Sequence, residues 1–299
     1  ITKWQLFSGI LPPLNRDEWI MYFNLYKEIP EFKLQNFNMS LQEFKIIFWW
    51  EWAHRFLGRL IGIAFILPLI YFTIKLGFKK LFNLYLIFIL ICFQGFLGWF
   101  MVQSGLVYDV DVSHFRLSAH LLFAFIILSL IFWNYLKTKV KINLGNTINL
   151  IFPLSFLFLI FLQIIIGAFV SGMDAGKIYN SWPLMGSTIF PDDNVYSNLF
   201  KLSAFSDPSL VQFIHRKLAY LIGFVYLYLL FKIYKKKMKH LYKSINIVGI
   251  LILLQIVLGI FTLLYGAQII IASMHQISSI FLVVSCIYFL FINTKSNLQ

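Results

Sequence analysis

The stretch HRFLGRLIG at residues 54–62 recurs as HRKLAYLIG at residues 215–223, with the same residue at six of the nine positions. The same offset of 161 residues places Gly98 on Gly259. Both copies begin with a histidine and continue into apolar sequence. Self-similarity at a fixed offset indicates internal duplication, so we expect two copies of one structural unit.

Composition assigns the chain to the membrane. It is 60% hydrophobic, 19% aromatic and only 12% charged, and its mean hydropathy is +0.80. A soluble domain carries about twice that share of charged residues. A helix needs about 20 apolar residues to cross a bilayer, and seven stretches reach that length. We predict spans near 46–74, 81–103, 115–136, 148–170, 211–231, 245–265 and 269–292.

The net charge of +13 is unevenly distributed along the chain. Lysine-rich connections without Asp or Glu follow the first, third and fifth predicted spans: KLGFKK (75–80), KTKVK (137–141) and KIYKKKMKHLYK (232–243). All twelve acidic residues lie elsewhere, in 1–51, 109–111 and 174–207. This is the positive-inside pattern. We therefore predict no nucleic-acid partner, membrane lipid as the surroundings, and lysine loops that face the cytoplasm or matrix.

The duplication predicts an all-α polytopic membrane protein built from two parallel, pseudo-repeated four-helix bundles. In the second copy the span 148–170 precedes the long outer loop, and the first copy shows no counterpart. We therefore expect a further helix upstream of Ile1 and eight helices in all, of which seven are evident. The predicted domains are an N-terminal half-bundle, 1–143, and a C-terminal half-bundle, 144–299.

Four histidines lie near the same end of predicted spans. His54 and His215 begin the repeated stretch, and His120 (in RLSAH) and His275 (in IASMH) follow 66 and 60 residues later. An imidazole within a span is costly and usually functional. Two pairs in register suit axial ligation of two hemes between helices, so all four are predicted iron ligands. The alternative for any single histidine is an interhelical hydrogen bond.

A second repeated pattern, Gln-x-x-x-Gly, lies on the spans that run outward. It occurs as Gln94/Gly98, Gln163/Gly167 and Gln255/Gly259. Small residues let helices approach closely, and a glutamine hydrogen-bonds across a bundle or to a buried group. We interpret this pattern as helix packing rather than chemistry.

Arginines accompany the histidines: Arg55, Arg59, Arg116 and Arg216. Heme propionates are anionic and usually point toward water, where a guanidinium binds a carboxylate in bidentate fashion. These four arginines are therefore candidates for propionate contacts. The alternative is that they extend to the membrane interface.

The two copies differ at one position that bears on chemistry. Glu51 precedes His54 by three residues on the same helix face, and its counterpart at the 161 offset is Gln212. A carboxylate beside a metal-binding histidine moves protons or stabilises a developing cation, whereas a glutamine does not titrate. Glu51 is therefore the predicted catalytic residue, in the reactive half. The alternative is an ion pair with Arg55, one turn away.

The segments FWWEWAHRFLGRLIG (48–62) and IHRKLAYLIG (214–223), with RLSAH and IASMH, resemble heme A synthase of the alphaproteobacterial and mitochondrial type. The opening ITKWQLFSGILPPLNRDEW is similar to the first outer loop of that family. The likeness extends over essentially the whole chain.

The resemblance implies an oxidoreductase that converts the C8 methyl of heme O to a formyl group by successive hydroxylations, giving heme A for terminal oxidases. It implies that His54 and His120 flank the substrate heme and that His215 and His275 ligate a heme b cofactor. Glu51 matches the family's catalytic glutamate.

The resemblance further implies a location in the bacterial inner membrane with the histidine ends facing the periplasm, or in the mitochondrial inner membrane in a eukaryote. Heme O synthase and cytochrome oxidase assembly factors are the expected protein partners, and the electron donor is unidentified. The alternative function is a two-heme membrane cytochrome that transfers electrons from quinol without modifying heme. That alternative explains the four histidines but gives no reason for the difference between Glu51 and Gln212.

Overall fold

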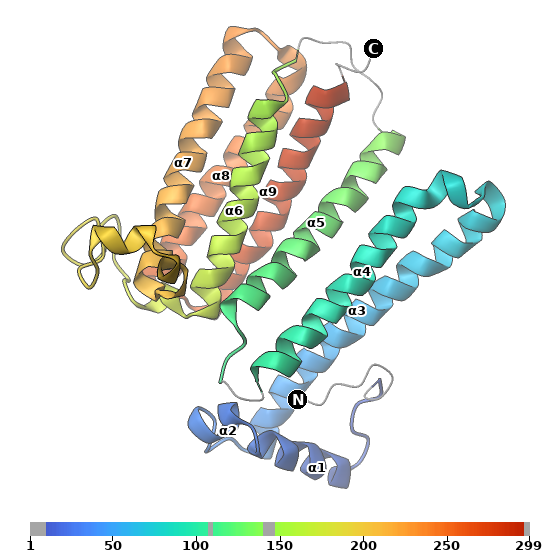
Figure 1. The fold of residues 1–299 in the computed structure, drawn as a ribbon, viewed down its shortest axis with the longest axis vertical. Coiled ribbons are helices and arrows are strands. Elements are labelled where there is room, and N and C mark those ends of the chain that lie inside the picture. Colours follow the sequence, from blue (N-terminus) through green and yellow to red (C-terminus); the bar gives the residue numbers. More distant parts are fainter. Residues whose placement is uncertain (1–9, 107–109, 140–146, 296–299) are drawn as a thin grey trace. The chain divides into compact units, whose positions relative to one another are not determined.

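The computed structural model describes residues 10–106, 110–139 and 147–295 (Figure 1). Within them, seven helices are long and apolar enough to cross a membrane. They are α3 (Leu41–Leu76), α4 (Phe78–Gly105), α5 (His114–Lys139), α6 (Ile151–Gly172), α7 (Pro208–Lys235), α8 (Lys239–Leu264) and α9 (Ile269–Lys295). The predicted all-α fold with seven evident spans is confirmed.

The chain divides into two compact units, Ile1–Phe123 and Ala124–Gln299. The division falls within α5. The predicted boundary between residues 143 and 144 lies outside the described residues, in 140–146.

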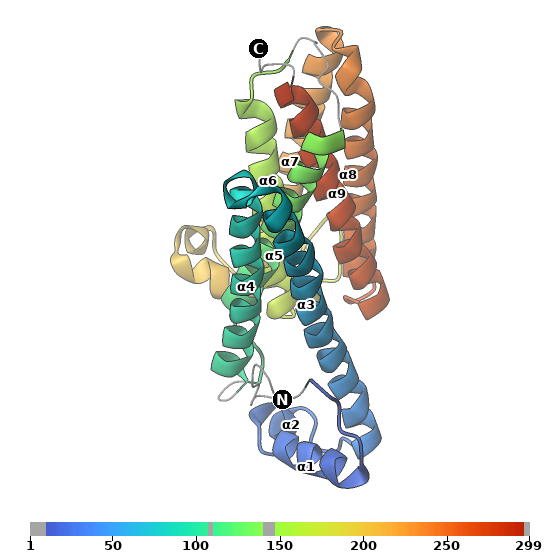
Figure 2. The same cartoon turned by 90° about the vertical axis from the view of Figure 1, so that its right-hand side faces the viewer.

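In the first unit, local sequence signals set both ends of α3. Ser40 and Glu43 form a capping box: the Glu43 carboxylate accepts from the Ser40 backbone N–H at 2.8 Å, and the Glu43 N–H donates to the Ser40 hydroxyl. Such caps satisfy backbone donors at a helix start. The helix ends at Gly77, whose φ of 83° suits glycine, and α4 begins at the next residue. This single-residue connection makes α3 and α4 a hairpin (Figure 2).

Two short helices precede α3 in the first unit, α1 (Arg16–Lys27) and α2 (Pro30–Leu34). Their core is an aromatic cluster with the start of α3: Trp19, Phe23, Tyr26, Phe44 and Phe48. The Tyr26 hydroxyl donates to Glu31 at 2.9 Å and accepts from the Asn36 amide at 2.8 Å. Burial raises the pKa of Tyr26 to about 12. This aromatic cluster was not predicted, because α1 and α2 are too short and too polar to resemble membrane spans.

In the second unit, α6 to α9 form a four-helix bundle in which α6 contacts α7 and α9, and α8 contacts the same two helices (Figure 1). A buried asparagine joins two of them. The Asn293 side chain, fully buried near the end of α9, accepts from the Ile148 N–H and donates to the Ile148 carbonyl, both at 2.9 Å. The segment that enters α6 is thereby fixed to α9.

Replacing Asn293 with leucine should destabilise the second unit, because it leaves the Ile148 N–H and carbonyl buried without these partners. At about 1–3 kcal/mol for each such group, the free energy of unfolding should fall by roughly 2–5 kcal/mol. Denaturation of the detergent-solubilised protein measures this. The control is Asn134→Leu, since the Asn134 side chain donates to the Leu130 carbonyl of its own helix. Equal losses in both variants would contradict the role assigned to Asn293.

Candidate functional site

The structure brings His54 of α3 and His120 of α5 together within the first unit. Their ring centres are 6.4 Å apart and the ring planes are inclined by 70°. A metal atom bound to one nitrogen of each ring, at about 2 Å per bond, would place the ring centres about 6 Å apart. The observed spacing therefore leaves room for one metal atom between the two imidazoles.

The predicted packing motif of α4 contacts this pair directly. The Gln94 side-chain amide donates to the His120 backbone carbonyl at 2.9 Å. Gly98 faces the ring of the same residue, so that a Cβ atom placed there would lie 3.0 Å from His120 Cε1. The Gln-x-x-x-Gly pattern was interpreted as general helix packing, and its specific partner was missed because sequence does not show which helix lies opposite.

The second unit repeats this arrangement twice. Gln163 of α6 donates to the carbonyl of His215 at 3.1 Å, and Gln255 of α8 donates to the carbonyl of His275 at 3.1 Å. Gly167 and Gly259 face the rings of these same histidines. His215 and His275 lie close enough to interact electrostatically. Each of the two histidines is therefore held by the helix that precedes it in the chain.

The paired histidines suit a metal cofactor in which most of the metal ligands belong to the cofactor itself. In the described part of the chain, no group of three or more His, Cys, Asp or Glu side chains is arranged to hold a metal ion. The Nδ1 atoms of His120, His215 and His275 are buried and have no hydrogen-bond partner among the described residues. Paired imidazoles supply two axial nitrogens, and a porphyrin supplies the remaining four. The residues present therefore fit heme better than a bare metal ion.

Glu51 and Gln212, equivalent in the repeat, have different partners. The Arg55 guanidinium pairs with the Glu51 carboxylate at 3.0 Å. The ion pair weighed as the alternative role of Glu51 is therefore present. Gln212 is buried and donates to the Tyr179 carbonyl at 3.1 Å. The titratable member of the pair lies three residues before His54, in the first unit.

The four arginines have unlike surroundings. Arg116 lies over the Phe100 ring, 5.1 Å from its centre. The two terminal nitrogens of Arg59 are buried and have no hydrogen-bond partner among the described residues. Arg216 donates to the carbonyls of Tyr179, Ser181 and Leu184 at 3.0–3.1 Å. Propionate binding by these residues stays a prediction, and Arg216 has a second role that the sequence did not indicate.

Arg216 holds the long segment between α6 and α7 beside the end of α7 that carries His215. The segment contains the short helices η1 (Ala175–Lys177), η2 (Tyr196–Phe200) and η3 (Leu202–Ser206) (Figure 1). Asp192 accepts from the Ser187 N–H and the Thr188 hydroxyl, both at 3.0 Å. These bonds hold the pKa of Asp192 below its usual range. The segment between α6 and α7 is therefore held by hydrogen bonds among its own residues as well as by Arg216.

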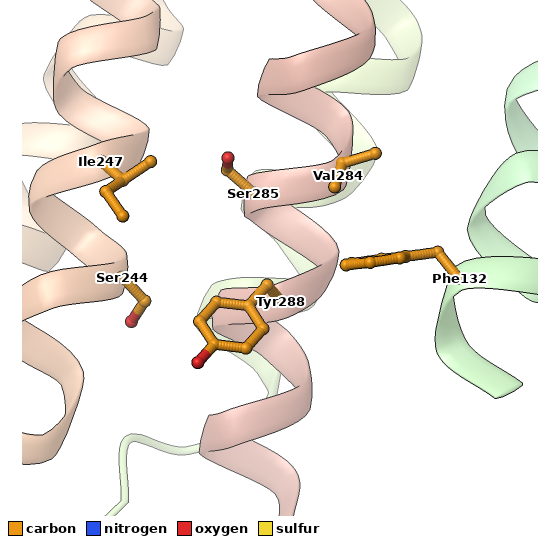
Figure 3. A pocket seen from close by; sticks show the side chains of 6 residues that line it. All are labelled: Phe132, Ser244, Ile247, Val284, Ser285 and Tyr288. Atoms are coloured by element: carbon orange, nitrogen blue, oxygen red, sulfur yellow. The ribbon is translucent and has the colours of Figure 1, made fainter. Parts of the chain in front are cut away.

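A groove with a cavity volume of about 210 Å³ lies elsewhere in the second unit (Figure 3). Its lining comes from α5, α8 and α9: Phe132, Ser244, Ile247, Val284, Ser285 and Tyr288. None of the four histidines lines it. The groove is therefore separate from the candidate heme-binding residues.

These features define a helical membrane protein in which each unit carries a pair of span-embedded histidines supported by neighbouring helices. The chain belongs to the cytochrome oxidase assembly protein family, whose model matches residues 1–287. It is 49% identical to heme A synthase of Pelagibacter ubique, over 99% of this chain and 88% of that protein. It is 43% identical to heme A synthase of Rickettsia bellii, over 94% and 86%. With heme A synthase of Flavobacterium johnsoniae the identity is 39%, over 96% and 87%. The predicted resemblance is confirmed.

Replacing Arg216 with methionine should loosen the segment between α6 and α7. Methionine retains an apolar stem but removes the donors to three carbonyls, and hydrogen bonds to charged groups contribute about 1.5–3 kcal/mol each. We expect faster proteolytic cleavage within 179–184 and a lower unfolding temperature of the solubilised protein. Lys217→Met is the control, because Lys217 lies over the rings of Phe213 and Tyr220. Cleavage at the same rate in both variants would show that Arg216 does not hold the loop.

Proposed function

We propose that this protein is a heme A synthase, an oxidoreductase that converts the C8 methyl group of heme O to the formyl group of heme A. The observation that carries the proposal is the pair His54 and His120, whose ring centres are 6.4 Å apart, beside Glu51. Relatives named heme A synthase that match nearly the whole chain support it. Each of two successive hydroxylations replaces a hydrogen of the methyl group with a hydroxyl group, a two-electron oxidation that requires an external oxidant and a source of oxygen. Loss of water from the resulting diol leaves the formyl group.

In this proposal the first unit binds the substrate. His54 and His120 hold the heme O iron from opposite sides, which fixes the macrocycle relative to α3 and α5. Gln94 and Gly98 hold His120 in place. Arg59, whose terminal nitrogens have no hydrogen-bond partner among the described residues, supplies a cationic partner for a propionate, as do Arg55 and Arg116. Substrate binding thus combines two axial bonds with charge pairing, which together fix the reacting edge.

Glu51 is the group proposed to act during the oxidation. Its carboxylate is paired with the Arg55 guanidinium at 3.0 Å, which holds the side chain in one orientation. A carboxylate accepts a proton from a hydroxyl group on the reacting carbon or stabilises positive charge that develops at that carbon. Arg55 is in this account the residue that positions Glu51, so the ion pair and the catalytic role are compatible.

The second unit is proposed to hold heme b through His215 and His275. Bound there, heme b supplies one-electron transfer. Gln212 and Arg216 at the outer end of α7 bond to loop carbonyls, so this unit places a neutral amide where the first unit has a carboxylate. In this proposal the second unit binds a cofactor and has no acidic side chain at position 212.

The proposed location is the bacterial inner membrane, with the histidine ends toward the periplasm and the lysine-rich connections in the cytoplasm. Positive-inside bias supports this orientation. Heme O synthase and cytochrome oxidase assembly factors are proposed partners, since one would provide the substrate and the others would receive the product.

Replacing His215 or His275 with alanine should remove the low-spin heme b signal and abolish turnover, since a lost axial ligand changes both heme affinity and potential. Absorption spectroscopy and heme extraction from the purified variants measure this. His240→Ala is the control, because His240 lies outside both pairs. Full heme b content in the His215 and His275 variants would refute the assignment.

Replacing Glu51 with glutamine tests the catalytic claim, since it keeps the side-chain size and installs the residue found at Gln212. Both hemes should still bind, while conversion of heme O falls by about 10²-fold or more, the usual scale for losing a positioned acid–base group. Mass spectrometry of extracted heme measures substrate and product. The control is Glu43→Gln, at the exposed start of the same helix, which should convert heme O normally.

Two results would count against this function. Heme A formation at the wild-type rate by Glu51→Gln would leave the glutamate with its ion-pair role alone. Extraction of heme B as the sole heme, with no formyl product from added heme O, would instead favour the two-heme electron-transfer cytochrome.

A further inference from the structure

Three of the four histidines contact a glycine on the helix that precedes them. A Cβ atom built at Gly98, Gly167 or Gly259 would lie 3.0, 3.1 or 3.2 Å from the Cε1 atom of its histidine. The partners are His120, His215 and His275 respectively. These distances are tighter than most real Cβ contacts, so any side chain larger than glycine would press on the edge of the ring.

The contact is paired each time with a hydrogen bond to the same histidine. The glutamine four residues before each glycine donates to the backbone carbonyl of that histidine, at 2.9 Å for Gln94, 3.1 Å for Gln163 and 3.1 Å for Gln255. Residues four apart share a helix face. One face of the preceding helix thus contacts the histidine twice: the glutamine hydrogen-bonds to the histidine backbone, and the glycine leaves room for the histidine ring.

Glycines in these helices differ in what they face: a Cβ atom at Gly105 would press on Val112 and one at Gly249 on the Tyr226 side chain, so neither meets a histidine. A Cβ atom at Gly58, Gly62, Gly95 or Gly223 would have nothing within 4 Å. Gly95 is especially informative, because it lies in α4 between Gln94 and Gly98. The glycines of the repeated pattern are therefore distinguished by what they face.

We propose that Gly98, Gly167 and Gly259, with their partner glutamines, are positioning residues that set the orientation of the axial imidazoles and hence the strength of the iron–nitrogen bonds. This inference rests on the proposed function, since it requires these histidines to bind heme iron. A metal–imidazole bond is short and directional, so a ring displaced by an added methyl group cannot keep the same bond. Groups that orient a ligand typically change metal affinity by about 10–100-fold when they are lost.

The test uses the cofactor unit, where heme content is measurable without turnover. Gly167→Ala is compared with Gly223→Ala in the full-length purified protein. Alanine favours a helix more than glycine does, so a generic effect would stabilise both variants. We expect Gly167→Ala to bind heme b about 10–100-fold more weakly, with a changed low-spin spectrum and a shifted midpoint potential. Gly223→Ala should match the wild type in all three.

A parallel comparison addresses the other unit. Gly98→Ala should weaken binding of added heme O, whereas Gly95→Ala in the same helix should not. If Gly167→Ala cannot be recovered from the membrane, Gln163→Leu replaces it. This variant removes the bond to the His215 carbonyl and the 3.3 Å contact between the Gln163 amide and His215 Nε2, and it leaves Gly167 unchanged beside the ring. A shifted heme b potential in Gln163→Leu is the expected result.

The outcomes separate this inference from the proposed function. If His215→Ala retains heme b, the ligand assignment itself fails. If His215→Ala loses heme b but Gly167→Ala keeps wild-type content, spectrum and potential, the histidine is a ligand and the glycine does not position it. Equal changes in Gly167→Ala and Gly223→Ala would also overturn the inference, because the effect would not depend on contact with the ring.

Discussion

An imidazole inside a hydrocarbon layer is costly, and the three histidines on α5, α7 and α9 are each contacted by a glutamine and a glycine of the helix that precedes them. A helix already satisfies its own backbone hydrogen bonds, so the additional bond from Gln163 to the carbonyl of His215 orients one residue without supporting the helix itself. Gly167 then admits the ring. The spacing of four residues allows one helix face to do both, which explains why the pattern and the histidines recur together.

The repeated helices α3 and α7 differ in the partners of the residues beside His54 and His215. In α3, Glu51 and Arg55 bond to each other. In α7, Gln212 and Arg216 stand at the same spacing but both reach the Tyr179 carbonyl. A neutral amide and a guanidinium suit an array of loop carbonyls, whereas a carboxylate there would repel them. The exchange of Glu51 in α3 for Gln212 in α7 therefore replaces a carboxylate with an amide that bonds to the segment between α6 and α7.

Sequence predicted the features that depend on local composition. Spans follow from runs of apolar residues. The ends of α3 were not predicted: the first span was placed at 46–74, whereas the Ser40 and Glu43 capping box and Gly77 set the helix at Leu41–Leu76. The histidine pairs were predicted because they recur in register. By contrast, α1 and α2 are stabilised by aromatic packing on Phe44 and Phe48, and a periodicity analysis of short polar helices does not reveal such contacts.

The same distinction explains why the glutamine–glycine pattern was recognised as a packing pattern without its partner being identified. Its spacing shows that Gln94 and Gly98 share a face, yet the partner of that face depends on which helix packs against α4. The structure shows that His120 lies there, and the two residues then have separate roles. Gln94 donates a hydrogen bond to the His120 carbonyl, and Gly98 leaves space for the His120 ring. A small residue in a membrane helix thus indicates that a group on a neighbouring helix packs closely against it. In the proposed heme-binding role of His120, the direction of its ring matters as much as its distance, because a nitrogen ligand binds along its lone pair.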